Sequence, residues 1–217
     1  MENYLQSTPF LDFDQIEWLP FSIDESKSTK ELAIELYFKV RDHFLYDPYH
    51  LDLRLDALKA SNILKKRRAW CVEKAIVFAT LARKYGIPSR LGYAIVTNHI
   101  GVDKLTTILK RNEIVFHGYV EVYIGDRWVK CTPAFDQRIC SLSGVEPLDW
   151  NGEEDSLFQA FSGGQRFMEY LHDYGTFNDV PLLKMNQEMK KYYPHLFENI
   201  YEERSFSFRH LPNEQLV

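Results

Sequence analysis

The chain has 217 residues, of which 45% are hydrophobic and 15% aromatic, enough for a packed core and too many for a disordered chain. Its net charge of −5 leaves no basic excess to neutralise a phosphate backbone, which argues against a nucleic-acid partner. Cys71, Cys131 and Cys140 show no metal-like spacing, so we expect reduced thiols and a cytoplasmic protein. Because no run approaches the roughly 20 apolar residues that span a bilayer, and no secretory signal is evident, we expect no membrane partner.

The first 27 residues are predicted to form an irregular N-terminal arm whose aromatic side chains, Phe10, Phe13, Trp18 and Phe21, pack on the rest of the protein. A helix is predicted to begin at Ser28, because Ser28 with Glu31 forms a capping-box pattern. That helix should end near Pro48, since the residue before a proline avoids helical backbone angles. A short helix over residues 57–64 follows and leads into the basic run at residues 65–68.

The next predicted helix begins at Cys71 and has apolar residues at helical spacing, namely Val72, Ala75, Ile76, Ala79 and Ala82. Gly86 suits a left-handed C-terminal cap, and Pro88 blocks continuation. Cys71 therefore lies at a helix N-terminus, where unpaired N–H groups and the helix dipole favour the thiolate over the thiol. The ordinary alternative for a single cysteine is that it simply packs in the core.

The chain then changes to a β pattern. Residues 90–97 predict a strand, residues 98–113 a surface excursion, and residues 114–124 and 127–132 a hairpin around Gly125-Asp126. Helices are expected over residues 156–161 and 185–193, and a loose tail from about Phe206. We divide the chain into an arm at 1–27, a core at 28–140 and a C-terminal extension at 141–217 that packs on the core.

Thiolate chemistry requires a nucleophile, a base and a group that orients the base. Cys71 at a helix start is followed by His117 early in the hairpin and by polar residues after the second hairpin strand. A histidine on a strand is by itself more often structural. The order of these residues and their placement on a helix and a strand favour a catalytic pair.

Several stretches then carry a family resemblance: Val40-Arg41-Asp42, Tyr46-Asp47, Lys59-Ala60-Ser61, Arg68-Ala69-Trp70-Cys71, and residues 81–90 and 117–130. They resemble the transglutaminase-like superfamily, which shares the papain-like cysteine-protease fold. The resemblance covers roughly residues 30–140. It implies an α+β core in which a helical N-terminal part packs on an antiparallel sheet, with Cys71 as nucleophile and His117 as its base.

The third catalytic position departs from the family pattern. The common pattern has an Asp four residues after the hairpin Trp, and here Thr132 occupies that position, followed by Pro133. Asp136 lies four residues further on and can supply a carboxylate. We favour Asp136, because a carboxylate stabilises imidazolium, with Thr132 as the alternative and a degraded site as a third possibility.

The reaction implied is acyl transfer through a Cys71 thioester, by transamidation or by amide or peptide hydrolysis, on a protein or peptide amide. Trp70 is a candidate wall of the acyl site, or else a core residue. No cofactor is expected, and a metal site from Cys71, His99 and His117 has little support at this spacing. The main rival is a catalytically inactive module of the same fold that serves binding or assembly. The sequence specifies neither the second oxyanion donor nor the oligomeric state.

Overall fold

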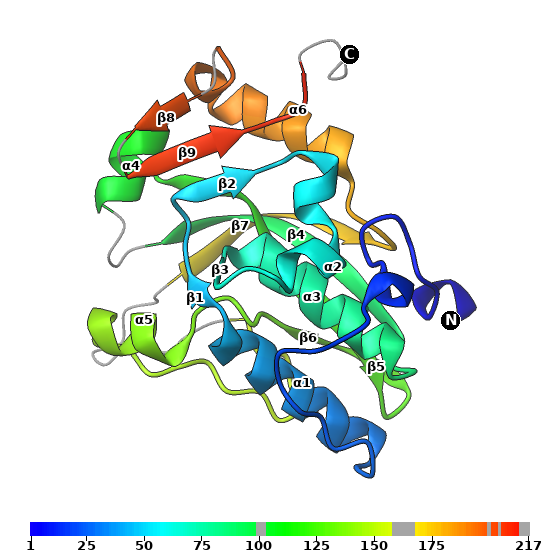
Figure 1. Cartoon of the computed structure of the whole chain (residues 1–217). Coiled ribbons are helices and arrows are strands. Elements are labelled where there is room, and N and C mark those ends of the chain that lie inside the picture. The colour runs from blue at the N-terminus through cyan, green and yellow to red at the C-terminus, as the bar shows by residue number, and fades with distance from the viewer. Residues whose placement is uncertain (99–102, 158–167, 199–200, 204, 213–217) are drawn as a thin grey trace.

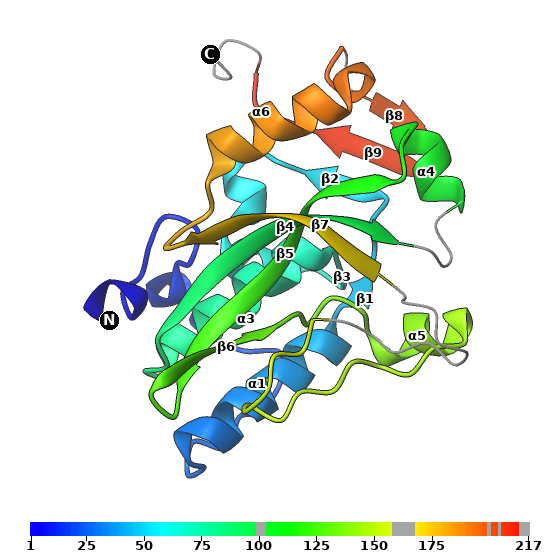
Figure 2. The ribbon, with the colours of Figure 1, turned by 180° about the vertical axis from the view of Figure 1, so that it is seen from behind.

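In the computed structural model, which describes residues 1–98, 103–157, 168–198, 201–203 and 205–212, a long central helix lies against a curled antiparallel sheet (Figure 1). The sheet has the order β6-β5-β4-β7. Its strands are β4 (Ser89–Asn98), β5 (Glu113–Ile124), β6 (Arg127–Cys131) and β7 (Met168–Phe177). Seen from the opposite side, the sheet lies in front of this helix (Figure 2). The mixed helix and sheet architecture predicted from the sequence is therefore confirmed.

The central helix is α3 (Cys71–Lys84), and it begins and ends where the sequence predicts. Every residue from Cys71 to Arg83 is buried, so the helix is enclosed on all sides. Gly86 has a φ of +73° and forms a left-handed turn after the helix. A residue with a side chain would disfavour this backbone conformation. Helix α1 (Thr29–His43) packs on α3 and has the predicted capping box of Ser28 and Glu31, but it ends earlier than predicted.

Two small sheets flank the main one. Strand β1 (Leu45–Tyr46) pairs in parallel with β3 (Arg68–Ala69), directly before α3. Strand β2 (His50–Asp52) pairs with β9 (Phe206–Arg209), which also pairs with β8 (Tyr201–Glu203). The predicted loose tail is therefore wrong at this point, because Phe206 and Phe208 are fully buried. A Phe-Ser-Phe alternation at residues 206–208 is the signal that the prediction passed over.

The remaining helices lie at the periphery. They are α2 (Ala60–Ile63), α4 (Asp103–Leu109), α5 (Gln137–Ser143), α6 (Leu182–Tyr192) and the short 3₁₀ helices η1 (Glu2–Tyr4), η2 (Phe13–Gln15), η3 (Leu55–Leu58) and η4 (Pro194–Leu196). Helix α4 lies where a surface excursion was expected, and helix α5 lies in a stretch for which no element was predicted from the sequence. In the N-terminal arm Phe10 is buried, and Phe13 and Phe21 pack on the core as predicted, whereas Trp18 is 57% exposed. Of the helix predicted at 156–161, residues 158–161 lie outside the described residues.

Candidate active site

Cys71 is the first residue of α3, and its side chain is almost completely buried, with 2% of its surface exposed. Backbone N–H groups of Gly118, Val72 and Cys71 itself point at the sulfur and favour the thiolate. Burial acts in the opposite direction and is the larger effect, raising the pKa of the Cys71 thiol to about 11. The low-pKa thiolate expected from the helix terminus is therefore not the resting state, because desolvation outweighs the backbone dipoles.

Gly118 lets the strand that carries the histidine approach the start of α3. A Cβ on Gly118 would lie 3.0 Å from the Cα of Val72 and 3.2 Å from the carbonyl oxygen of Cys71. Any larger residue would therefore push β5 away from the helix. The sequence shows Gly118 only as one of the residues alternating with His117, and the need for close approach became visible only in the structure.

His117 precedes Gly118 on β5 and is 1% exposed. The pairing of β4 and β5 shifts at Ile95, where Phe116 has a φ of +60°. This is a β-bulge, and a non-glycine residue in the left-handed region costs about 1–3 kcal/mol and is often associated with functional sites. The bulge directly precedes His117 and sets the direction in which its ring leaves the strand.

The imidazole of His117 lies in an aromatic environment. Its ring centroid is 6.5 Å from that of Phe135 and 6.1 Å from that of Tyr170. Burial lowers the pKa of His117 to about 4, so the ring is neutral at neutral pH. Its Nε2 atom has no hydrogen-bond partner in the described part of the chain, and no hydrogen bond there joins the ring to Cys71. The resting pair is a thiol and a neutral imidazole.

Neither candidate for the third position contacts the imidazole through a hydrogen bond among the residues described. The Thr132 hydroxyl donates to the carbonyl oxygen of Gly118 over 3.1 Å. The carboxylate of Asp136 caps α5 by accepting from the N–H groups of Arg138 and Ile139, and it also accepts from the N–H of Tyr46 over 2.6 Å. Asp136 therefore holds the chain at Tyr46, and its predicted role in orienting His117 stays a prediction.

Tyr46 is the residue whose role the sequence did not reveal. The pairing of β1 with β3 places it beside Ala69, two residues before Cys71. Its hydroxyl lies beside the Cys71 sulfur. Burial first, then the negative charge of an ionised Cys71, with smaller contributions from Tyr49, Asp47 and a hydrogen bond to Cys71, raise the pKa of Tyr46 well above its usual value. Its ring lies 4.7 Å, centroid to centroid, from that of Phe135. Tyr46 thus supplies an O–H donor at the sulfur.

Three polar side-chain atoms near α3 are buried without a hydrogen-bond partner among the described residues. The described residues offer no hydrogen-bond partner to Trp70 Nε1, the Tyr93 hydroxyl or His117 Nε2. The Tyr93 hydroxyl lies close enough to Cys71 that the thiol, after burial and Asp179, contributes to raising the pKa of Tyr93. An unpartnered buried polar atom costs about 1–3 kcal/mol. We call Cys71, His117, Tyr46, Trp70 and Tyr93 the thiol site.

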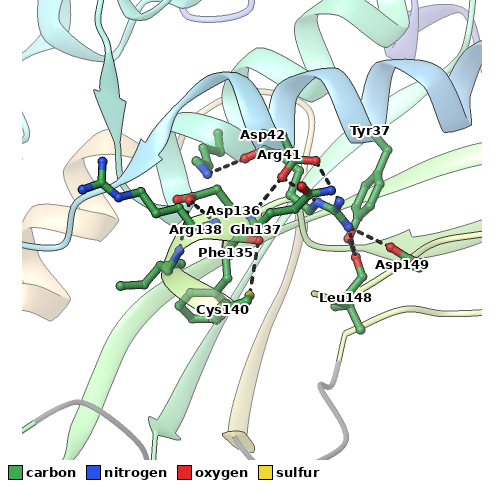
Figure 3. Close-up of polar contacts among 12 residues, drawn as sticks. Tyr37, Arg41, Asp42, Phe135, Asp136, Gln137, Arg138, Cys140, Leu148 and Asp149 are labelled. Atoms are coloured by element: carbon green, nitrogen blue, oxygen red, sulfur yellow. Dashed lines mark hydrogen bonds and ion pairs between the residues drawn. The ribbon is translucent and has the colours of Figure 1, made fainter. Parts of the chain in front are cut away.

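A second polar group, the Arg41 cluster, holds the segment after β6 in place (Figure 3). Arg41 is 2% exposed and donates to the carbonyl of Leu148, and it pairs with Asp42 and Asp149. Lys74, one turn after Cys71 on α3, donates to the carbonyl of Arg41 over 2.8 Å, and burial lowers the pKa of Lys74 to about 7. We define the cluster by Arg41, Asp42, Lys74, Asp149 and the Leu148 carbonyl.

The Arg41 cluster also positions the residues that follow β6. Asp42 accepts from the N–H of Gln137, and the Tyr37 hydroxyl bonds to the carbonyls of Leu148 and Thr132 at 2.6 and 3.2 Å. These contacts fix the segment that contains Phe135 and Asp136 against α1. The position of Phe135, whose ring lies beside that of His117, thus depends on hydrogen bonds between this segment and α1.

The described residues contain no group of three or more His, Cys, Asp or Glu side chains placed to hold a metal ion, and His99 lies outside them. All three cysteines are free and buried.

A cysteine at the start of the central helix and a histidine on the adjacent strand characterise this site, and the comparison with known proteins gives the family. The sequence matches the transglutaminase-like superfamily over residues 19–133, more than half of the chain, and the protein belongs to that superfamily. The match includes Cys71, His117 and Thr132 and stops before Asp136. No curated protein and no solved structure matches the chain. Within the described residues, no helix has the length and apolarity required to cross a membrane.

Proposed function

We propose that the protein catalyses cysteine-dependent acyl transfer, with Cys71 as nucleophile and His117 as general base. The observation that carries this proposal is the convergence at one sulfur of the α3 N-terminus, the Gly118 N–H next to His117, and the Tyr46 hydroxyl. A sulfur that only packs in a core has no need of these donors. Membership of the transglutaminase-like superfamily, which is commonly cysteine-dependent, supports the same assignment.

The pKa values favour a mechanism in which the proton moves during attack. With the thiol pKa raised to about 11 and the histidine pKa lowered to about 4, a preformed thiolate–imidazolium pair is disfavoured. The neutral His117 accepts the thiol proton as sulfur attacks the substrate carbonyl. The resulting oxyanion accepts hydrogen bonds from the Cys71 N–H and the Tyr46 hydroxyl, which are the donors we assign to the oxyanion hole.

Collapse of the tetrahedral intermediate breaks the C–N bond and leaves a thioester on Cys71. His117 gives its proton to the departing nitrogen, which leaves as ammonia or an amine. In the second step His117 takes a proton from an incoming amine or water, which attacks the thioester carbonyl. The C–S bond breaks, and His117 returns the proton to the Cys71 sulfur, which regenerates the thiol and the neutral imidazole. The products are a new amide in transamidation or a carboxylic acid in hydrolysis, and the residues described here perform both steps without a cofactor.

The proposed substrate is a protein or peptide amide, such as a glutamine carboxamide, with Trp70 as a wall of the acyl site. Trp70 is 4% exposed in this closed state, so this role requires its surroundings to open when substrate binds. The three free thiols suit a reducing compartment, and we propose the cytoplasm.

The test is incorporation of dansylcadaverine into dimethylcasein, followed together with ammonia release. The wild-type protein should release ammonia with or without the amine, and Cys71→Ser and His117→Gln should abolish release. A matched control, Cys131→Ser, removes a buried thiol on β6 that is not one of the residues of the thiol site and should keep activity. Ammonia release that survives Cys71→Ser would sink the assignment of the nucleophile.

The second candidate function is a binding or assembly module that keeps the fold without catalysis. It is favoured by one observation, namely that neither Thr132 nor Asp136 bonds to the His117 ring in the described structure. A well-folded wild-type protein that forms no acyl-enzyme with any amide or activated ester would support this function over catalysis.

A further inference from the structure

A surface pocket of about 160 Å³ lies between the β1–β3 pair and α5, which are neighbours in the fold (Figure 1). One of its lining residues is Tyr46, which also lies beside Cys71 in the thiol site. The other walls come from Leu45 and Arg68 on one side and Arg138, Ile139 and Leu142 on the other. The pocket and the thiol site therefore share Tyr46.

The pocket is positively charged although the protein carries a net charge of −5. The Arg138 guanidinium has no partner among the described residues, whereas Arg68 forms a long ion pair with Asp47, whose Oδ2 atom lies 3.8 Å from Nη1 of Arg68. The one acidic lining residue, Asp136, is 3% exposed and already accepts three backbone N–H bonds. The Arg138 guanidinium is therefore available to a ligand, and Arg68, whose side chain is 64% exposed, can exchange its long ion pair with Asp47 for a pair with a ligand.

The same pocket presents apolar surface to solvent. Leu142 on α5 is 74% exposed, more than any other large hydrophobic side chain in the described part of the chain. Leu45 and Ile139 are partly exposed beside it. An exposed leucine next to two exposed guanidinium groups fits a ligand that has an apolar group next to a carboxylate, because Arg recognises carboxylates through paired N–H donors.

The basic run at residues 65–68 has no role in the proposed chemistry, and its members lie in different surroundings. Lys66 forms a salt bridge with Glu73, and Lys65 bonds to Asn62 and lines a different pocket. Arg68 pairs with Leu45 in the β1–β3 register and lies three residues before Cys71. Arg68 lines the pocket beside Tyr46 and also the neighbouring pocket that contains Asp47, whereas Lys65 and Lys66 do not line the pocket beside Tyr46.

We propose that this pocket binds a carboxylate and an adjacent apolar side chain of the acyl donor, next to the reacting amide. The inference rests on the proposed acyl transfer and names its substrate class as acidic or carboxylate-terminated peptides. The carboxylate comes either from an acidic side chain or from the free C-terminus of a short peptide, and both sources present the same group to Arg68 and Arg138.

The test is an NMR titration of the full chain with Cys71→Ala, which binds without turnover. Three peptides share a leucine and a glutamine amide: one adds a glutamate side chain, one ends in a free α-carboxylate, and one is neutral at both places. The guanidinium Nε–H resonances of Arg68 and Arg138 should shift saturably. At least one carboxylate peptide should bind about fivefold tighter than the neutral peptide, as exposed charge-assisted hydrogen bonds allow.

Arg68→Gln with Arg138→Gln should abolish this preference, whereas Lys65→Gln, which removes a charge from the same run outside the pocket, should keep it. Equal affinity for all three peptides, absence of saturable shifts, or a preference that survives the double substitution would overturn the proposal. Because the titrated protein lacks the thiol, a selective pocket combined with no dansylcadaverine incorporation would reject the catalytic function alone.

Discussion

Two polar regions adjoin the first turns of α3, and they differ in whether their buried polar atoms have partners. In the Arg41 cluster each charged side chain has a hydrogen-bond or ion-pair partner (Figure 3). In the thiol site, Trp70 Nε1, the Tyr93 hydroxyl and His117 Nε2 have none in the described part of the chain. A saturated buried network stabilises the fold, whereas unpartnered atoms cost about 1–3 kcal/mol each, a cost that a bound substrate can relieve.

The largest expected effect on stability comes from a substitution in the Arg41 cluster, the region whose polar atoms have partners. Arg41→Ala leaves the Leu148 carbonyl without its donor and Asp42 without its cation, and should lower the free energy of unfolding by about 3 kcal/mol. Urea denaturation measures it. Asp149→Asn is the matched control, because the Asp149 side chain is 78% exposed and should change stability by less than about 1 kcal/mol. If the Arg41→Ala protein were as stable as the wild type, the Arg41 cluster would not stabilise the fold and would not differ from the thiol site in this respect.

The next prediction concerns the neutral imidazole of His117 in the thiol site. The pKa of His117 falls from 6.5 to about 4 on folding, so the unfolded chain takes up the proton first. Protonation of His117 therefore leaves the free energy of unfolding unchanged above pH 6.5 and lowers it as the pH falls towards 4, by about 3 kcal/mol in total. His117→Gln should lack this portion of the acid destabilisation. Unfolding curves at pH 7 and pH 4.5 test it, and parallel losses in both proteins would show that His117 is not buried and neutral.

Asp136→Asn tests which region Asp136 serves. The substitution weakens the α5 cap and the bond to the Tyr46 N–H, and should lower the free energy of unfolding by about 1–2 kcal/mol. Because Asp136 has no bond to His117 in the structure, we expect the pH profile of Cys71 alkylation by iodoacetamide to keep its midpoint. A midpoint moved to higher pH would instead support the role predicted from the sequence, with Thr132→Val as the control at the alternative position.

The smallest expected effect is that of Cys71→Ala, which removes one sulfur and should change stability by about 1 kcal/mol or less. On the same helix Ile76 is fully buried, and Ile76→Ala should cost about 2–5 kcal/mol as other core truncations do. Thermal denaturation compares the two variants. If Cys71→Ala were as damaging as Ile76→Ala, the cysteine would be a packing residue.

Local signals made much of the fold predictable. The capping box of Ser28 and Glu31, the Gly86 cap and the Gly125-Asp126 turn are patterns in which neighbouring residues determine the backbone, and all three are confirmed. Strand β7 and helix α5 were not predicted. Strand β7 is paired only with β4, far away in the sequence, and its exposed and half-buried residues give no clear alternation.

The thiol site was predictable in part for the same reason. Cys71 and His117 follow from a helix start and a hairpin, which the sequence marks. The raised pKa of Cys71, the approach of Gly118 and the placement of Tyr46 depend on how elements pack, and no local pattern encodes them. Asp136 illustrates the limit: a nearby carboxylate suggested a catalytic partner, while the structure shows it bonded to three backbone N–H groups.

The central claim, that Cys71 is a nucleophile served by His117, is tested most directly by acyl-enzyme formation with p-nitrophenyl acetate. Peptide mass spectrometry locates the acetyl group, and release of p-nitrophenolate gives the rate. We predict a burst of about one equivalent in the wild type with acetyl on Cys71, and a loss of about 10²-fold or more in rate in His117→Gln, as expected for a missing general base. Acetylation that is absent from Cys71, or that proceeds equally fast in His117→Gln, would contradict the account.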